Sequence, residues 1–403
     1  MKFSKLSQLF LVSILGLSVA TLLTSCAYVT IDYVFVANSA GSGNGSSGQI
    51  LTYDADSSTG ALRSGQPAVS SGGINPISLA TTADYSNLYA ANAGSNNVVH
   101  FAIAGNGVLT QKDVVTTSAA PASVAVNAAA TYLYVVSGPN PSMLTEYSLS
   151  SGAIGSIVAQ VPLTLPTNPT DTIVPTGVNV LTNNNAVYVS AYDQSSYNPG
   201  GSTSSNANPG WVFGYAVGSG GTLTSASQSP YKAGVKPSAL VSDPTNRFVY
   251  VTDFASNELI GYTIQGGSTL NFLINGPFKT GNEPNAICID PRGIYLYVTD
   301  ALDSTVVAFN INLATGTPSA AVNTTGSQTN STDTTPVAII VDPALGRYVY
   351  TANLEGNSIS GFRLDANTGA LTQTQNTPYP TGAQPVALAA VPHGNHSIQT
   401  TSP

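Results

Sequence analysis

The stretch from Glu283 to Asp300, EPNAICIDPRGIYLYVTD, decides the fold of this chain. A proline opens it, and a short apolar run, Ala286 to Ile289, precedes the turn-forming residues Asp290 to Gly293. A second run, Ile294 to Thr299, is rich in aromatic and β-branched residues and leads to Asp300. Short runs of this composition, bounded by turn formers, are typical of two antiparallel strands joined by a tight turn.

The same unit recurs along the chain, which is therefore built from repeats. Six opening prolines are followed 13 or 14 residues later by a tyrosine of the second run. A seventh opener, Pro385, has no such tyrosine, whereas Tyr33 to Asn38 is a second run with no opener. The two incomplete units complement each other, which predicts a ring closed by pairing Val386 to Val391 with the N-terminal blade. The openers are Pro76, Pro121, Pro175, Pro237, Pro284, Pro336 and Pro385.

We therefore predict an all-β fold, a seven-bladed β-propeller of four-stranded antiparallel blades. The chain of 403 residues without its first 25 has 378, which is 54 for each of seven blades. That length suits four short strands with their loops. The propeller is expected to cover residues 32–392 and to be followed by a tail, 393–403. No stretch outside the first 25 residues has helical apolar spacing.

The first 25 residues have the features of a secretory signal peptide. Two lysines precede the apolar segment Phe10 to Leu23, which leads to Leu23-Thr24-Ser25-Cys26. These residues resemble the cleavage box of bacterial lipoproteins, which implies a lipid on Cys26, a short linker over 26–31 and a location in the cell envelope. Ala27 in place of an aspartate points, by the same resemblance, to the outer membrane. The alternative is an ordinary cleaved signal with a chance cysteine.

The composition limits the classes of partner. Charged residues are only 7% of the chain, far below the typical ~25%. The net charge is −8, and it becomes −10 when the two signal-peptide lysines are removed. Nucleic acid and anionic lipid headgroups are therefore poor partners, so we expect membrane contact only through the lipid anchor. We expect a monomer whose ligand is a protein or a carbohydrate.

The order of strands in each blade assigns the loops to two faces. The turns between the first and second strands and between the third and fourth are short, and we call their side the short-turn face. The other connections carry the extensions, and we call their side the loop-rich face. Long loops on a rigid scaffold commonly carry function. The extensions are Asn38 to Gly48, Val161 to Val174, Ala191 to Gly210, Asn271 to Asn282 and Pro318 to Thr335.

Candidate ligand-binding residues lie on this loop-rich face. The longest extension contains aromatic and acidic residues and ends at the only tryptophan. Such groups suit contact with a protein or a carbohydrate. The alternative is that the tryptophan belongs to the core and that acidic or amide residues at strand ends bind the backbone of the following loop. The candidates are Tyr192, Asp193, Tyr197, Trp211, Asp253, Glu258 and Asp300.

Motifs for cofactor or metal chemistry are weak. Gly43 to Gly48 matches a dinucleotide fingerprint, but no helix follows it. His393 and His396 have no third ligand nearby, and Cys288 lies in an apolar run, where a free cysteine behaves as a small hydrophobe. We therefore expect no cofactor and no metal.

The repeated YVTD, YTAN, FVAN and YAAN segments and the Gly-x-Leu-Thr segments resemble the YVTN-repeat, lactonase-like propellers of the 6-phosphogluconolactonase type. The resemblance covers Tyr33 to Val391 and implies the fold. Enzymes of this type carry an Arg-His pair after a repeat proline and a glutamate after a YVxN segment. This chain has neither at the matching positions.

Two functional hypotheses follow. The first is a non-catalytic, lipid-anchored module that binds a ligand on the loop-rich face. The second is a lactone hydrolase with a displaced site that uses Lys232, Lys236, Asp253 or Glu258. A phosphorylated cytosolic lactone does not suit an exported acidic protein, and the missing pair favours the first hypothesis.

Overall fold

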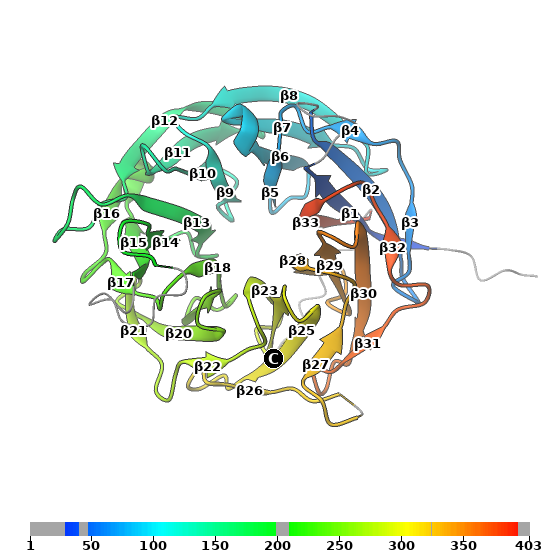
Figure 1. Ribbon diagram of the computed structural model, residues 1–403. Helices are drawn as coiled ribbons and strands as arrows, with labels where there is room; N and C mark the ends of the chain where they lie inside the picture. Colours follow the sequence, from blue (N-terminus) through cyan, green and yellow to red (C-terminus); the bar gives the residue numbers. More distant parts are fainter. Residues whose placement is uncertain (1–28, 40–46, 199–208, 324, 394–403) are drawn as a thin grey trace, which may run out of the picture.

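Seven β-sheets stand around a central axis like the blades of a wheel (Figure 1). The computed structural model describes residues 29–39, 47–198, 209–323 and 325–393. Among these residues the helical segments are two short 3-10 turns, η1 (Ala93–Ser95) and η2 (Ser219–Gly221). None of their helices is long and apolar enough to cross a membrane. The predicted all-β, seven-bladed propeller is confirmed.

The innermost strand of each blade lines the axis, and six of the seven begin at an opening proline. Blades are numbered along the chain, with blade one at the N-terminus. In the order of blades one to seven, the inner strands are β33 (Pro385–Pro392), β5 (Pro76–Thr81), β9 (Pro121–Val126), β13 (Ile173–Val180), β18 (Pro237–Ser242), β23 (Pro284–Ile289) and β28 (Pro336–Val341).

The second strands are the most buried part of each blade, since neighbouring blades cover both of their faces. In the same order they are β1 (Thr30–Asn38), β6 (Asn87–Asn92), β10 (Tyr132–Ser137), β14 (Ala186–Asp193), β19 (Phe248–Asp253), β24 (Tyr295–Asp300) and β29 (Tyr348–Asn353). The third strands are β2 (Gln49–Asp56), β7 (Asn97–Ile103), β11 (Met143–Ser150), β15 (Gly210–Val217), β20 (Glu258–Gln265), β25 (Thr305–Ile311) and β30 (Ser358–Leu364).

The ring closes as predicted, through pairing of the two ends of the chain. Strand β33 runs antiparallel to β1, with Val34 opposite Ala390 and Val36 opposite Leu388. The first strand begins at Thr30, three residues before the expected Tyr33. This closure needs no covalent link, because backbone hydrogen bonds between β1 and β33 join the N- and C-terminal segments within blade one.

The outer edge of the wheel has two forms. In blades two and three it is one strand, β8 (Leu109–Thr116) or β12 (Ala153–Pro162). In the other five blades it is two short strands that both pair with the third strand. These are β3 (Leu62–Ser64) with β4 (Val69–Ser70), β16 (Leu223–Ser225) with β17 (Tyr231–Lys232), β21 (Thr269–Phe272) with β22 (Phe278–Lys279), β26 (Pro318–Ala320) with β27 (Thr329–Ser331), and β31 (Leu371–Gln373) with β32 (Tyr379–Pro380).

The two forms differ at the third-strand position that faces the buried aromatic residue of the second strand. In the five divided blades this position holds Thr52, Gly214, Gly261, Ala308 or Gly361. Gly261 and Gly361 stand opposite the buried tyrosine of the second strand, and a Cβ on Gly261 would lie 2.4 Å from Leu273. The missing side chain lets the outer segment bend inward and insert a residue. In blades two and three, His100 and Glu146 occupy this position, and the outer strand runs straight.

Two predicted extensions are therefore wrong in part. Asn271 to Asn282 and Pro318 to Thr335 were expected to be loops, but they contain pieces of the divided outer strand. Sequence periodicity could not show this, because the pieces are only two to four residues long.

Tyrosine hydroxyls join neighbouring blades near the short-turn face. In five blades the second-strand tyrosine donates to a backbone carbonyl in the outer turn of the next blade, as Tyr297 does to Gly369 O at 3.0 Å. The bond from Tyr350 to Gly60 O, at 2.9 Å, joins blade seven to blade one. Blade one has Phe35 at the equivalent place, and Tyr134 of blade three lies opposite the buried Glu146. The remaining bonds of this kind are those of Tyr89, Tyr188 and Tyr250.

Candidate functional site

Blades four and five bring most of the predicted ligand-binding residues together on the loop-rich face. Tyr192 and Asp193 end β14, and Tyr197 follows in the next connection. Trp211 lies opposite Ala191 on one side and opposite Lys232 on the other. The antiparallel ladder therefore sets Tyr192, Trp211 and Lys232 at one end of blade four, where blade five begins.

Lys236 lies among three aromatic rings at the entrance to blade five. Its Nζ is 5.7 Å from the ring centre of Tyr192, 5.4 Å from that of Tyr197 and 4.7 Å from that of Phe254. The two tyrosine rings meet edge to face at 5.4 Å. Among the described residues, the Lys236 ammonium has no carboxylate partner and no hydrogen bond. Aromatic faces hold a cation through their quadrupole without neutralising its charge.

Lys232 contacts the face of Trp211, with its Nζ 3.7 Å from the ring centre. Burial lowers the pKa of the Lys232 ammonium, and the nearby Asp193 carboxylate acts in the opposite direction. The indole ring is half-buried and packs on the core of blades three and four. Trp211 therefore also belongs in part to the core, which was the alternative interpretation. Its Nε1–H is buried and has no hydrogen-bond partner among the described residues.

The two acidic residues in this cluster shape its loops. Asp253 is buried, and its carboxylate accepts hydrogen bonds from the backbone N–H of Val235 at 2.7 Å and of Lys236 at 2.8 Å. Asp193 accepts from the backbone N–H of Ser195 at 2.8 Å. Each carboxylate thus orders the chain beside it, and the Asp253 bonds place Lys236 among its aromatic rings.

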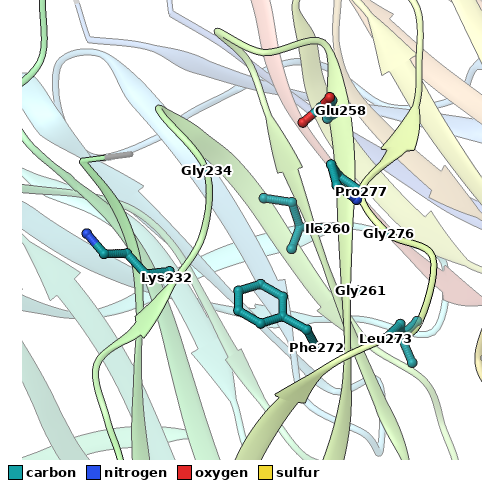
Figure 2. Close-up of a pocket in the computed structure, with 9 residues that line it drawn as sticks. All are labelled: Lys232, Gly234, Glu258, Ile260, Gly261, Phe272, Leu273, Gly276 and Pro277. Carbon is teal, nitrogen blue, oxygen red and sulfur yellow. The ribbon is translucent and has the colours of Figure 1, made fainter. Parts of the chain in front are cut away.

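A groove lies next to this cluster, between Lys232 and the outer part of blade five (Figure 2). We call it the blade 4–5 groove. Its volume is about 270 Å³. Phe272 is 59% exposed there, and Figure 2 shows its ring between Lys232 and the strand that carries Ile260. The other lining residues are Gly234, Glu258, Gly261, Leu273, Gly276 and Pro277.

An ion pair stands at the rim of the groove. Lys279 Nζ is 2.8 Å from the Glu258 carboxylate, and the pairing of β22 with β20 sets the two residues directly opposite each other. The Glu258 side chain is mostly covered and the Lys279 side chain is mostly exposed. Glu258 therefore joins the predicted site through the groove rather than through the Lys236 cluster.

Asp300 lies apart from these residues, at the end of the second strand of blade six. It is fully buried, and its Oδ1 has no hydrogen-bond partner among the described residues. Burial raises the pKa of Asp300 to about 8, and Asp303 adds to this effect. Hydrogen bonds from the Gly281 backbone and Thr305 act in the opposite direction. Asp300 is therefore placed to hold the chain segment that leads into blade six.

Sequence reasoning missed Phe254, Phe272 and Lys279. Their neighbours in sequence carry no motif, and each enters the site only through the packing of blade five. Lys236 was expected only within the displaced hydrolase. A useful signal was available, however, because three of the four lysines after residue 25 fall between residues 232 and 279.

Metal and histidine chemistry find little support in the described part of the chain. No group of three His, Cys, Asp or Glu side chains is placed there to hold a metal ion. His100 is buried between Asp113, at 2.9 Å, and Asn87, at 2.8 Å, so both ring nitrogens are engaged within blade two. Cys288 packs partly buried in an apolar cluster, and burial raises the pKa of its thiol. Cys26 and His396 lie outside the described residues.

Comparison with known families now adds to this geometry. The family model described as Lactonase, 7-bladed beta-propeller, matches residues 104–398, which is more than half of the chain. The chain belongs to this lactonase family. The resemblance drawn from the YVTN-like repeats is thereby confirmed, whereas the comparison with curated proteins found no match.

Solved structures with the same fold include proteins related by name to sugar lactones. A candidate 6-phosphogluconolactonase from Bacteroides fragilis has a TM-score of 0.69 and 19% identity, over 90% of this chain and 98% of that one. The periplasmic gluconolactonase of Pseudomonas aeruginosa has a TM-score of 0.69 and 18% identity, over 90% and 99% of the two chains. At these identities the likeness is one of fold.

Within the lactonase family, this chain keeps the wheel but lacks the expected catalytic pair at its openers. Ser238-Ala239 and Asn285-Ala286 follow the openers of blades five and six, where the resemblance led us to look for Arg-His. The described lysines of the loop-rich face lie instead in blades four and five, with carboxylates beside them.

Proposed function

We propose that this lactonase-family propeller binds a sugar-derived ligand, a lactone or the acid formed when its ring opens, on the loop-rich face of blades four and five. The observation that supports this most directly is the Lys236 ammonium. It lies among three aromatic rings and has no carboxylate partner among the described residues. A cation held in this way remains available to a carbonyl or carboxylate oxygen of a ligand.

The surrounding groups fit the same class of ligand. A sugar ring has apolar C–H faces that pack on aromatic side chains, and hydroxyl groups that need hydrogen-bond partners. The site offers exposed aromatic surface on Phe272 and charged groups on Glu258 and Lys279. Ligand sites typically combine such apolar walls with a few placed polar groups.

Binding can be tested with gluconate, glucono-1,5-lactone and glucose titrated calorimetrically into the purified full-length protein. We expect Lys236→Ala to weaken binding of gluconate at least tenfold, because the ligand carboxylate loses its charged donor. Lys112→Ala, on the outer strand of blade two, is the matched control and should leave the affinity within twofold. Equal affinities for the two variants would contradict the proposal.

A second candidate function, hydrolysis of the lactone at the same site, is favoured by the Glu258–Lys279 pair. In this reaction the Glu258 carboxylate takes a proton from water, and the water oxygen attacks the lactone carbonyl carbon. The developing oxyanion would be stabilised by an ammonium group, and the ring C–O bond then breaks. The leaving alkoxide recovers the proton, which yields the open hydroxy acid.

Hydrolysis can be separated from binding by following acid release from glucono-1,5-lactone at constant pH. Turnover that falls at least a hundredfold in Glu258→Gln, while gluconate binding persists, would establish the hydrolase. Release no faster than the spontaneous reaction in the wild-type protein would leave a binding module. Glu355→Gln, on blade seven, is the control for the loss of one carboxylate.

Export and lipid attachment at Cys26 complete the proposal. The signal-like N-terminus supports export, and a protein of the same fold is a periplasmic gluconolactonase. Incorporation of a clickable fatty acid in a bacterial host, lost in Cys26→Ser, tests the anchor. Fractionation of the membranes then tests the outer-membrane location.

A further inference from the structure

The short-turn face carries the arginines of this chain, whereas the loop-rich face carries three of the four lysines that the structure describes. The five arginines lie in or beside the short turns of blades five, six, seven and one. They are Arg247, Arg292, Arg347, Arg363 and Arg63. Their surroundings differ, and this difference points to a second site.

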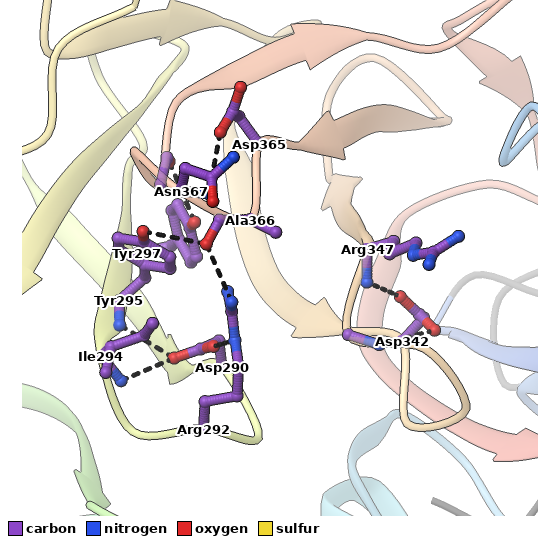
Figure 3. A network of polar contacts seen from close by, with 12 residues as sticks. Asp290, Arg292, Ile294, Tyr295, Tyr297, Asp342, Arg347, Asp365, Ala366 and Asn367 are labelled. Carbon is purple, nitrogen blue, oxygen red and sulfur yellow. Dashed lines mark hydrogen bonds and ion pairs between the residues drawn. The ribbon is translucent and has the colours of Figure 1, made fainter. Parts of the chain in front are cut away.

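Two of these arginines tie neighbouring blades together. Arg247 Nη1 donates to Leu313 O at 2.5 Å, and its guanidinium lies 5.1 Å from the ring centre of Phe248. Arg292 Nε pairs with Asp290 at 2.8 Å, and its Nη1 donates to Ala366 O at 2.8 Å (Figure 3). In each case the arginine lies in the turn between the first and second strands of its blade. Its guanidinium donates a hydrogen bond to a backbone carbonyl in the turn between the third and fourth strands of the next blade.

Arg347 and Arg363 have no such partners. Arg347 precedes the aromatic residue of its turn, as Arg247 does, but among the described residues its guanidinium makes no hydrogen bond or ion pair. The same holds for Arg363, which stands opposite Tyr348 in the β29–β30 ladder. Both side chains are exposed and line one cavity of about 560 Å³.

The carboxylates nearby are already engaged with backbone groups. Asp342 accepts from the backbone N–H of Arg347 and of Tyr348, and Figure 3 shows the Arg347 side chain leading away from it. Asp365 also lines the cavity, and its Oδ1 accepts from the backbone N–H of Asn367 at 2.8 Å and of Thr368 at 3.1 Å. Two guanidinium groups therefore face one carboxylate that is partly occupied by its own turn.

We propose that this cavity, which we call the arginine cavity, binds a tetrahedral oxyanion, a phosphate or sulfate group carried by a small solute or a glycan. Two planar guanidinium forks supply up to ten N–H donors, and paired hydrogen bonds from a fork to oxyanion oxygens are among the strongest that proteins make. Asn367 and Thr372 add neutral polar groups to the lining. Arg247 and Arg292 serve a structural purpose, which leaves Arg347 and Arg363 for the ligand.

The test uses inorganic phosphate and sulfate as probes on the full-length protein at constant ionic strength. Calorimetry and thermal unfolding are followed for the wild type, for Arg347→Gln, for Arg363→Gln and for the double variant. Arg247→Gln and Arg292→Gln are the matched controls, because they remove the same charge from the same face. Acetate and chloride measure the effect of anions in general.

We expect saturable binding of phosphate or sulfate that raises the Tm of the wild type. Each of Arg347→Gln and Arg363→Gln should weaken it at least tenfold, with little change in Tm when no anion is present. The two controls should lower the Tm and keep the affinity within twofold. A tighter response to phosphate or to sulfate identifies which group the cavity prefers. An equal response to acetate, or affinities unchanged in the cavity variants, would overturn the proposal.

Discussion

The two faces of this wheel use cations in different ways. On the loop-rich face, Lys232 and Lys236 contact aromatic rings at the junction of blades four and five. On the short-turn face, Arg247 and Arg292 bond backbone carbonyls of the next blade. A lysine has one compact charge that aromatic faces can hold, whereas an arginine has a fork of donors that can join two turns.

This comparison teaches that position in the repeat does not decide the role of a residue. Arg247 and Arg347 occupy equivalent places in their turns, yet within the described part of the chain only Arg247 bonds the next blade. Substitutions on the short-turn face should therefore act mainly on stability, outside the arginine cavity. Those on the loop-rich face of blades four and five should act mainly on the ligand.

The largest expected effect is loss of stability in Gly369→Ala, on the short-turn face. Gly369 has a φ of +72°, and a Cβ there would lie 2.3 Å from Tyr295. Backbone strain and overpacking together should reduce the free energy of unfolding by about 3 kcal/mol or more, measured with urea. Gly220 has a φ of +70° and open space around it, so Gly220→Ala should cost only about 1 kcal/mol. If the two variants lost the same free energy of unfolding, contact with Tyr295 would not explain the effect of Gly369→Ala.

The next effect concerns pH at the joint between blades three and four. Burial raises the pKa of Glu146 to about 7, and the neighbouring Tyr134 side chain acts in the opposite direction. A carboxyl whose pKa is raised on folding favours the folded state below its unfolded pKa and loses that advantage as pH rises through its folded pKa. The free energy of unfolding should therefore fall by up to about 3 kcal/mol between pH 4.5 and pH 7.

Glu146→Gln should remove this part of the pH dependence, which urea unfolding at pH 5 and pH 8 would reveal. The exposed Glu355→Gln serves as the control and should follow the wild type. If Glu146→Gln showed the same fall as the wild type, the carboxyl of Glu146 would not be the group responsible.

A smaller effect, on binding alone, is expected for Phe272→Ala in the blade 4–5 groove. The ring is 59% exposed, so its removal should change the free energy of unfolding by less than about 1 kcal/mol. Affinity for a sugar ligand should fall roughly tenfold, or about 1.4 kcal/mol, because the groove loses its aromatic wall. Ile274 is 80% exposed and is absent from the groove lining, so Ile274→Ala should keep the wild-type affinity in calorimetry.

The smallest expected effect concerns the tyrosine hydroxyls that join neighbouring blades near the short-turn face. Tyr297→Phe removes the hydroxyl that donates to Gly369 O and should reduce the free energy of unfolding by about 1 kcal/mol. Tyr33→Phe, which removes a longer bond of 3.4 Å to Gly105 O, should cost less. Urea unfolding of both variants would show whether the hydroxyl or the ring joins the blades, since blade one already has Phe35 in the place of the tyrosine.

Local sequence signals were sufficient to predict the seven-bladed propeller. Opening prolines, turn residues and short β-rich runs are local signals, and their count and incomplete ends were enough for seven blades and for the pairing of β1 with β33. The order of the repeats also separated the two faces and directed attention to Tyr192, Asp193, Tyr197 and Trp211. It could not show whether these residues bind a ligand or pack in the core.

Which side chains contact one another depends on how the blades pack. Lys236 reaches the ring of Phe254 and two tyrosines of the preceding blade because Asp253 orders the chain between the blades. The divided outer strands occur where a glycine, an alanine or a threonine faces the buried aromatic residue of the second strand. The arginine cavity depends on Arg347, whose guanidinium makes no hydrogen bond or ion pair with the described residues. Such contacts join residues that lie far apart in sequence and follow no periodic pattern. They arise from the packing of neighbouring blades and cannot be predicted from the sequence of one repeat.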